Sequence, residues 1–440
     1  SFPTRRSSDL SDLKLTDFSK NLKNGDYDVI FGQLYGEDEN VIMSQRRRYE
    51  KAAEEFARLY PNREDIAVYS APGRTEVGGN HTDHQHGCVL AAAINLDIIA
   101  VVSFHNDGVI RIHSEGYPED CVDLSDLSVH SAEKGTSASL IRGIASRFSE
   151  IGVNIGGFDA YTVSDVLGGS GLSSSAAFEV LIGTVIDIHY NSGKAGAVEI
   201  AKIGQYSENE YFGKKSGLMD QMVSSVGGFV FIDFESAVDP VIKKIECGFE
   251  TSGYQLCITD TKGSHADLTD DYVSVPEEMN LVAKHFGKSC LREVNFIEFY
   301  KAIPELRKKC SDRAILRSAH FFSENERAGL EAAALSKGSF DEFLSLVKES
   351  GDSSAKWLQN LYSCSKPQEQ GIPLALLISE KILKDKGAVR VHGGGFAGTI
   401  QAFVPLSKCC DYENAMNELF GDKSCYRLKI RNFGGINIAE

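Results

Sequence analysis

Apolar positions in the first third of the chain follow first a helical and then a strand period. A helix is predicted from an apolar face with three- and four-residue spacing, formed by Tyr49, Ala52, Ala53, Phe56, Ala57 and Tyr60. Ser44 is its expected cap, and Arg46, Arg47 and Arg48 form its expected solvated opening turn. The long apolar run from Val89 to Ser103, the N-D-G turn at 106–108 and the run from Val109 to His113 then predict a meander.

Helices and strands alternate through the next stretch. Apolar spacing predicts helices at Leu140 to Phe148, Ala176 to Ile188 and Val198 to Tyr211, and a strand at Gly157 to Val163. No repeat and no low-complexity linker interrupts the chain. The 440 residues suggest two or three packing units, and the 42% apolar content is ordinary for a globular protein.

A glycine-rich run between the strand at 157–163 and the following helix has the composition of a phosphate-binding loop. Residues 165–180 read DVLGGSGLSSSAAFEV. Glycines at 168, 169 and 171 allow backbone N–H groups to turn toward an anion, and Ser173, Ser174 and Ser175 stand where a helix begins and its dipole is positive. No lysine follows in the Walker arrangement and the Rossmann spacing is absent, so any phosphate must be held differently.

Two further glycine-bearing segments accompany this loop: SAPGRTEVGGNHTDHQHG at 70–87 and VRVHGGGFAGTIQAFV at 389–404. The three segments, each next to a strand-like run, resemble the three motifs of the GHMP family of small-molecule kinases. Arg74 followed by His81, Thr82 and Asp83 is similar to the galactokinase signature of that family. The resemblance runs from about Phe56 to Phe403 and includes SGLMDQMVSSVGG at 216–228, LREV at 291–294 and HFFSENERAGLEAA at 320–333.

The resemblance implies an α+β fold of two domains with the active site in the cleft between them. The expected division is an N-terminal extension at 11–45, an N-terminal kinase domain at 46–235 and a C-terminal kinase domain at 236–440. Residues 1–10, SFPTRRSSDL, look like the translation of a sequencing adapter and are expected to be non-native; a natural polar tail is the alternative.

The same resemblance implies an ATP-dependent kinase that phosphorylates D-galactose at its anomeric hydroxyl to give α-D-galactose 1-phosphate. Asp220 matches the family's catalytic aspartate, which would accept or orient the hydroxyl proton, and Arg74 matches its charged partner. An adjacent arginine would keep the carboxylate ionised and could stabilise the transferring group. Whether Asp220 acts as a base or as an orienting group stays open at this point.

Nucleotide and metal sites are implied in the same way. Nucleotide contacts are expected from the loop residues Gly169, Gly171, Leu172, Ser173, Ser174, Ser175 and Ala176. Glu208 and one hydroxyl, from either Ser174 or Ser175, match the family's Mg²⁺ ligands, and an oxygen-only ligand set suits that ion. A solvent-facing helix acid is the alternative for Glu208, and Glu210 is assigned to that alternative.

Sugar contacts are implied for Asn80, His81, Asp83, Gly217 and Tyr272, with Asp83 accepting from adjacent sugar hydroxyls. His84 and His86 are expected outside the first layer of contacts. A zinc site in the H-T-D-H-Q-H block is disfavoured because consecutive positions point in different directions.

The chain departs from the signature at several positions. Asn80 stands where the family has a glutamate associated with the sugar's 6-hydroxyl, Glu76 stands where it has an asparagine, and His84 replaces an aromatic residue. Leu167 replaces a proline before the glycine loop. Because an amide lacks the carboxylate's charge, weaker discrimination at the sixth carbon is expected.

Charge and composition narrow the partners. A net charge of −16 disfavours nonspecific binding to nucleic acid or to anionic membranes. Ten cysteines without C-x-x-C pairs favour reduced thiols, and the apolar run at 89–104 is too short and polar to span a bilayer. A cytoplasmic monomer whose partners are a small sugar and ATP is expected.

Two alternatives stay open. Asn80 keeps alive a kinase for a related sugar such as N-acetylgalactosamine, arabinose or galacturonate. A galactose- and ATP-binding regulator without catalysis is disfavoured, because the S-S-S-A-A run, Arg74, Glu208 and Asp220 are all present.

Overall fold

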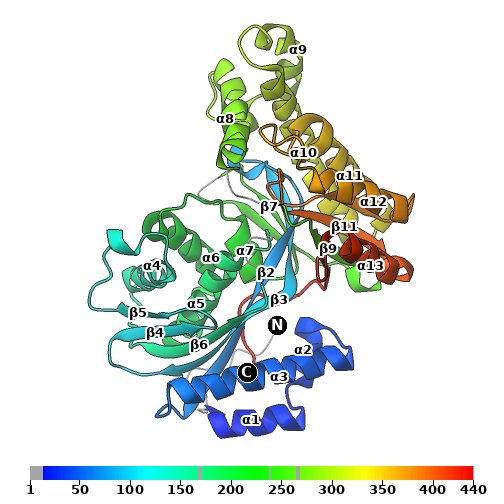
Figure 1. The fold of residues 1–440 in the computed structure, drawn as a ribbon. Helices are drawn as coiled ribbons and strands as arrows, with labels where there is room; N and C mark the ends of the chain where they lie inside the picture. Colours follow the sequence, from blue (N-terminus) through cyan, green and yellow to red (C-terminus); the bar gives the residue numbers. More distant parts are fainter. Residues whose placement is uncertain (1–12, 167–170, 237–238, 264–267, 440) are drawn as a thin grey trace.

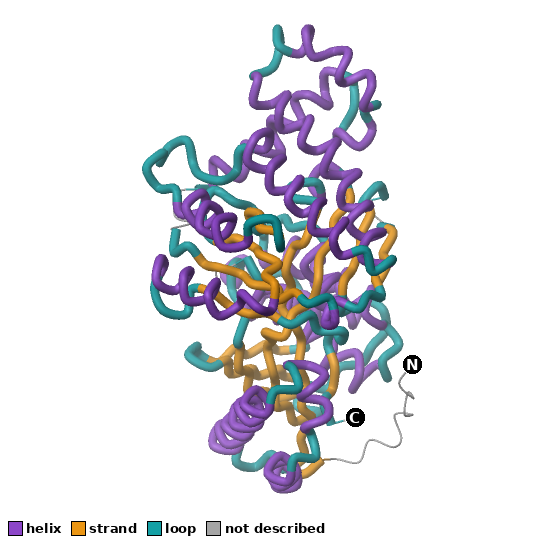
Figure 2. The backbone as a smooth tube through the Cα atoms, turned by 90° about the vertical axis from the view of Figure 1, so that its right-hand side faces the viewer, coloured by secondary structure: helices purple, strands orange, loops and turns teal. Residues whose placement is uncertain are grey.

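The computed structural model describes residues 13–166, 171–236, 239–263 and 268–439. The described chain builds two sheets with helices packed against both (Figures 1 and 2). No helix in these ranges is both long and apolar enough to cross a bilayer.

The larger sheet has nine strands in the order β1-β2-β3-β6-β4-β5, with β7 and β13 pairing β3 and β2 and with β8 pairing β7. Its strands are β1 (Leu13–Lys14), β2 (Asp65–Gly78), β3 (Cys88–Phe104), β4 (Val109–Ser114), β5 (Glu119–Asp123), β6 (Phe158–Ser164), β7 (Phe229–Asp233), β8 (Val241–Ile245) and β13 (Ile436–Asn437). The smaller, antiparallel sheet has the order β10-β11-β9-β12, formed by β9 (Tyr254–Asp260), β10 (Ala388–Val391), β11 (Thr399–Pro405) and β12 (Cys425–Leu428).

Helices cover both faces of the larger sheet. One face carries α1 (Leu15–Asn24), α2 (Asp28–Tyr35) and α3 (Glu39–Leu59), and the other carries α4 (Ser137–Glu150), α5 (Ser174–Asn191), α6 (Gly196–Tyr206) and α7 (Met219–Val226) (Figure 1). The C-terminal half holds α8 (Thr269–His285), α9 (Phe296–Leu306), α10 (Asp312–Ser336), α11 (Phe340–Ser353), α12 (Gly371–Leu383) and α13 (Cys409–Phe420).

Two cores explain why β2 and β3 are buried on both faces. Side chains alternate between faces along a strand. Ile66 and Val68 of β2 join the core beneath α1–α3, whereas Tyr69 and Ala71 join the core beneath α4 and α5. Both faces are therefore buried, and the usual apolar–polar alternation of a half-exposed strand is lost.

The structure corrects the predicted meander. β6 lies between β3 and β4, antiparallel to β3 and parallel to β4, so the two strands flanking the 106–108 turn are not neighbours. A short turn signal fixes a change of direction, but the partner of each strand depends on side-chain packing far along the chain.

The predicted start of the third helix is also wrong. α3 begins at Glu39, and the side chain of Asp38 caps it by accepting from the N–H groups of Asn40 and Val41 at 2.9 and 3.3 Å. The three arginines lie mid-helix, and the guanidinium of Arg48 is buried against Asp97 rather than solvated. The expected boundary between the N-terminal extension and the first kinase domain, between residues 45 and 46, falls inside this helix. β8, beyond residue 235, still belongs to the larger sheet.

Candidate functional site

β2 carries the first motif and is irregular where the motif's polar residues lie. Its pairing with β3 shifts register between Pro72 and Arg74 and again between Glu76 and Gly78. Such irregularities rotate the following side chains relative to a regular strand. They bring Arg74 and Glu76 to different neighbours, although both lie on the same strand.

Arg74 joins the first motif to the glycine–serine loop and to α7. Its Nε donates to Asp220 Oδ1 at 2.8 Å, and its backbone N–H donates to the carbonyl of Leu172 at 3.1 Å. A second guanidinium N–H donates to the carbonyl of Gly171. The arginine is buried, while a third of the Asp220 side chain is exposed, so the carboxylate stands at an accessible edge.

Ser173 completes the surroundings of this carboxylate. Its hydroxyl donates to Asp220 Oδ2. Ser173 precedes α5 in a left-handed conformation with φ of 59°, and the helix starts at Ser174, as the sequence predicts. The serines at 173–175 are half-buried, and Leu172 and Ala176 are buried beneath them. Gly169 lies outside the described residues.

Glu208 lies 12 residues before Asp220 in a single π-helical turn, Ser207–Phe212, that follows α6. The predicted helix at 198–211 is therefore α6 followed by this turn, and such turns are frequent at functional sites. The Glu208 carboxylate is buried and accepts from Ser216 Oγ at 2.5 Å, from Gln221 Nε2 at 3.0 Å and from Lys214 Nζ at 3.0 Å. Glu210 is exposed.

A second acid, which the sequence analysis missed, lies beside Glu208. The amide of Gln221 also donates to Glu179 Oε2 at 2.9 Å, so one side chain bridges two carboxyl groups. Burial raises the pKa of Glu179 well above its ordinary value, and the charge of Glu208 raises this pKa further. The buried environment therefore favours the protonated form of Glu179 over a second negative charge beside Glu208.

Three of the residues predicted to contact sugar, Asn80, His81 and Tyr272, contact the third motif. His81 Nε2 lies 2.9 Å from the carbonyl oxygen of Gly394, and the Tyr272 hydroxyl donates to the carbonyl of Gly395 at 3.0 Å. A Cβ at Gly394 would lie 2.6 Å from a carbon of the Tyr272 ring, so only glycine permits this approach. Three segments far apart in sequence thus meet at one loop.

Asp83 and Gly217 approach each other. A Cβ on Gly217 would come within 3.0 Å of Asp83 Oδ2, so glycine leaves room beside the carboxylate. Asp83 is half-buried and opens a short 3-10 turn, Asp83–Gln85.

Two histidines of the H-T-D-H-Q-H block, His81 and His84, lie close together. Among the described residues, no group of three or more histidine, cysteine or acidic side chains is arranged to hold an ion. His84 Nε2 lies 3.4 Å from His81 Nδ1, and burial lowers the pKa of His84 to about 4.

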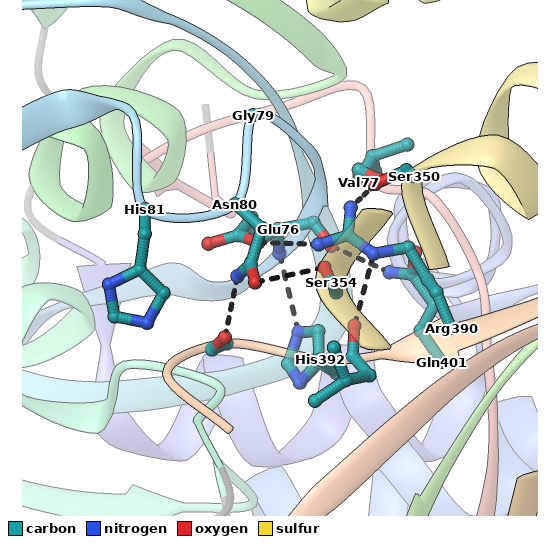
Figure 3. A network of polar contacts seen from close by, with 12 residues as sticks. Glu76, Val77, Gly79, Asn80, His81, Ser350, Ser354, Arg390, His392 and Gln401 are labelled. Carbon is teal, nitrogen blue, oxygen red and sulfur yellow. Dashed lines mark hydrogen bonds and ion pairs between the residues drawn. The ribbon is translucent and has the colours of Figure 1, made fainter. Parts of the chain in front are cut away.

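Asn80 differs from the other predicted sugar contacts because it is completely buried. Its amide donates to Glu76 Oε1 at 2.9 Å (Figure 3). The same amide donates to the carbonyl of Gly393 at 2.7 Å, and its Oδ1 accepts from Asn360 Nδ2 at 2.9 Å. A substrate hydroxyl could reach this amide only by displacing a protein partner.

Buried polar side chains of α10 hold the backbone of the loop between β2 and β3, residues 79–87, which we call the signature loop. Glu324 Oε1 accepts from the N–H groups of Gly79 and Asn80 at 3.1 and 3.3 Å, and His320 Nε2 donates to the Asn80 carbonyl at 2.9 Å. Burial opposes ionisation of Glu324, but His320, Arg390 and Arg327 together hold its pKa at about 2. These residues lie in the segments 320–333 and 389–404, but their residue types alone did not predict that they support the site.

Two family models match the chain. Residues 54–104 match the galactokinase galactose-binding signature, and residues 139–228 match the N-terminal domain of GHMP kinases. The first match contains Arg74, His81 and Asp83, and the second contains the glycine–serine loop, Glu208 and Asp220.

Solved structures share the fold. Lactococcus lactis galactokinase complexed with galactose is 22% identical, with a TM-score of 0.72 over 87% of this chain and 98% of that one. A D-glycero-D-manno-heptose 1-phosphate kinase from Bacteroides thetaiotaomicron is 18% identical, with a TM-score of 0.56 over 84% and 97% of the two chains. Methanococcus jannaschii mevalonate kinase is 14% identical, with a TM-score of 0.59 over 82% and 98%. Both family models match the chain in the order in which the motifs stand, so the chain is similar to the GHMP kinases and, within that family, to the galactokinases.

Proposed function

We propose that this chain transfers the γ-phosphoryl group of ATP to the anomeric hydroxyl of D-galactose, giving α-D-galactose 1-phosphate and ADP. The observation that carries the proposal is the contact of Asp220 with Arg74 and Ser173, where the signature strand, the glycine–serine loop and α7 meet. In a chain with the galactokinase galactose-binding signature, this carboxylate is the group best placed to meet a sugar hydroxyl.

In the proposed reaction the anomeric oxygen forms a bond to the γ-phosphorus, and the bond from that phosphorus to the bridging oxygen of ATP breaks. ADP leaves with the electron pair, and the hydroxyl proton passes to Asp220. Arg74 holds Asp220 through Oδ1 and leaves the carboxylate partly exposed. Its fixed positive charge also favours the negative charge that develops during transfer.

The nucleotide phosphates are proposed to bind at the start of α5. Gly169, Gly171, Leu172, Ser173, Ser174, Ser175 and Ala176 form this segment, and a helix N-terminus presents unpaired N–H groups and a positive dipole end to an anion. α5 runs from Ser174 to Asn191, so its dipole is well developed.

Mg²⁺ is proposed to bind Glu208 together with the hydroxyl of Ser174 or Ser175. A donor set made only of oxygens fits a hard cation. Ser216 and Gln221 hold the Glu208 carboxylate through Oε2, and the solvent-exposed Lys214 contacts it at Oε1. When bound, the ion would neutralise charge on the phosphates. Burial of Glu179, which shares the Gln221 amide with Glu208, disfavours a second negative charge at the site.

The sugar is proposed to lie against Asp83, His81, Gly217 and Tyr272. Asp83 offers a half-buried carboxylate that can accept from two adjacent hydroxyls, and Gly217 leaves the space beside it open.

Release of ADP, measured over a panel of sugars, tests the function. Galactose should give the fastest ATP- and Mg²⁺-dependent release, ahead of N-acetylgalactosamine, arabinose and galacturonate, with glucose as the negative control. Faster release with one of the other sugars would reassign the substrate. Sugar binding without ADP release would instead favour a regulator.

A further inference from the structure

Positions 76 and 80 of the signature carry each other's expected residues. The signature that this chain resembles has an asparagine at the first position and a glutamate at the second, whereas this chain has Glu76 and Asn80. The two side chains touch, with Asn80 Nδ2 donating to Glu76 Oε1 at 2.9 Å (Figure 3). The signature therefore keeps one carboxylate and one amide in contact, with their positions reversed.

Glu76 meets a buried cation from the third motif. Arg390 NH2 lies 2.9 Å from Glu76 Oε1, and both side chains are buried. The other guanidinium nitrogens of Arg390 donate to the carbonyls of Val77 and Val391. Among the described residues, Glu76 is the carboxylate in contact with this buried arginine, so removing it would leave the arginine with only the longer-range attraction of Glu324.

Asn80 fills the space on the other side of Glu76. Both amide hydrogens have acceptors, Glu76 Oε1 and the Gly393 carbonyl, and Oδ1 accepts from Asn360 Nδ2 at 2.9 Å and Ser354 Oγ at 3.4 Å. The amide thereby links the signature loop to the π-helical turn after α11 and to the glycine loop at 393–395. Its capacity for hydrogen bonds is fully used within the protein.

A carboxylate at position 80 would fit these neighbours poorly. It could not donate to the Gly393 carbonyl, and it would face Glu76 directly. Burial already raises the pKa of Glu76, against the opposing influence of Arg390 and the Asn80 amide. A second buried acid would find no second arginine at this point, because the guanidinium of Arg390 is fully engaged.

We propose that Glu76 and Asn80 are a compensated exchange: Asn80 positions the signature loop against the C-terminal glycine loop, and it does not select the sugar at its sixth carbon. The proposal rests on the proposed function, because it assigns a positioning role within the sugar site of a galactokinase. Discrimination at the sixth carbon then belongs to other side chains of the site.

A double-mutant cycle tests the exchange. Wild type, Glu76→Asn, Asn80→Glu and the double variant are compared by thermal unfolding and by kcat/KM for galactose. Each single change should lower Tm by more than about 5 °C and kcat/KM by about tenfold or more, because each leaves a buried charge unbalanced. The double variant should recover most of both losses, since contacting residues couple.

Gln85→Glu is the matched control. Gln85 is a fully buried amide of the same signature block, paired with Asn280 and with the backbone of Leu291 rather than with Glu76. The losses in Tm and kcat/KM caused by Gln85→Glu should add to those caused by Glu76→Asn, and the double variant should show no recovery. The exchange is disproved if adding Glu76→Asn recovers no more of the loss in Tm and kcat/KM caused by Asn80→Glu than of the loss caused by Gln85→Glu.

Asn80→Ala tests the second half of the proposal. A positioning residue should lower kcat/KM for galactose and for 6-deoxygalactose by the same factor, within about twofold. A change of more than about fivefold in the ratio of the two sugars would show that Asn80 reads the sixth carbon. The thermal cycle needs no turnover, so if no sugar in the panel is phosphorylated, the proposed function fails while the pairing is still decided.

Discussion

Two arginine–aspartate contacts, one at Asp97 and one at Asp220, lie in opposite surroundings. Asp97 of β3 is completely buried between Arg48 and Arg431, whose NH1 groups lie 2.6 and 2.9 Å from its oxygens. Tyr35 donates to the same carboxylate at 2.6 Å, and the Ser70 hydroxyl also donates to it. The cluster joins the helices α2 and α3 and the C-terminal tail to the centre of the sheet.

Asp220 has one arginine, Arg74, and one hydroxyl, and it stays partly exposed. The difference shows how the same ion pair serves structure or chemistry. A carboxylate saturated by two arginines and two hydroxyls has no capacity left for a substrate. A carboxylate held from one side keeps its orientation and can still meet a new hydroxyl.

Asp220→Asn should produce the largest functional effect. The change keeps the size of the side chain but removes the proton acceptor, so kcat should fall by about a hundred- to ten-thousandfold. Tm and galactose affinity should hardly move, because the site is partly exposed. Steady-state kinetics and thermal unfolding measure both; a loss in kcat below about tenfold would remove Asp220 from the catalytic role.

Asp97→Asn should give the reverse pattern. It leaves two buried guanidinium groups without their carboxylate, and the free energy of unfolding should fall by about 3–5 kcal/mol. Below the unfolding transition kcat should stay within about twofold of wild type. Asp165→Asn is the control, since Asp165 also contacts Arg48 at 3.1 Å but is 42% exposed, and its effect should stay below about 1 kcal/mol. Equal effects of the two changes in urea unfolding would contradict the structural role of Asp97.

Glu208→Gln tests the proposed metal site separately from both aspartates. A neutral amide of the same shape binds Mg²⁺ more weakly, so the Mg²⁺ concentration for half-maximal rate should rise by about tenfold or more, while KM for galactose stays constant. Glu210→Gln, an exposed acid in the same turn, should leave the Mg²⁺ titration unchanged. Identical titrations for the two variants would return Glu208 to a structural role.

The smallest expected effect is a pH dependence of the stability that Asp97 contributes. Burial alone would raise the pKa of Asp97, but Arg48 and Arg431, with Ser70 and Tyr35, lower it below the ordinary value. A lowered pKa contributes stability that is fully present above the unfolded value, near pH 4, and is lost as pH falls through the folded value. The stability difference between wild type and Asp97→Asn should therefore be constant above about pH 4 and shrink below it. A difference that is unchanged in stronger acid would contradict this linkage.

The sequence predicted the parts of the site whose chemistry is local. The start of α5 at the serine run follows from the serine and glycine pattern, and the candidate roles of Arg74, Glu208 and Asp220 follow from ordered motifs. The sequence did not predict Glu179, whose apolar surroundings in α5 are those of an ordinary buried helix face. Nor did it predict that Asn80 is enclosed, because its partners Gly393 and Asn360 lie about three hundred residues away.

By itself, the sequence determined which segments turn, which are apolar and which motifs they carry, because backbone preference and side-chain chemistry act over a few residues. Only the tertiary structure decided that β6 separates β3 from β4, that Arg48 is buried against Asp97, and that Glu76 and Asn80 share one contact. Each of these outcomes depends on which distant surfaces are brought together. The free energy of a buried charge is set by those surfaces rather than by its neighbours in the chain.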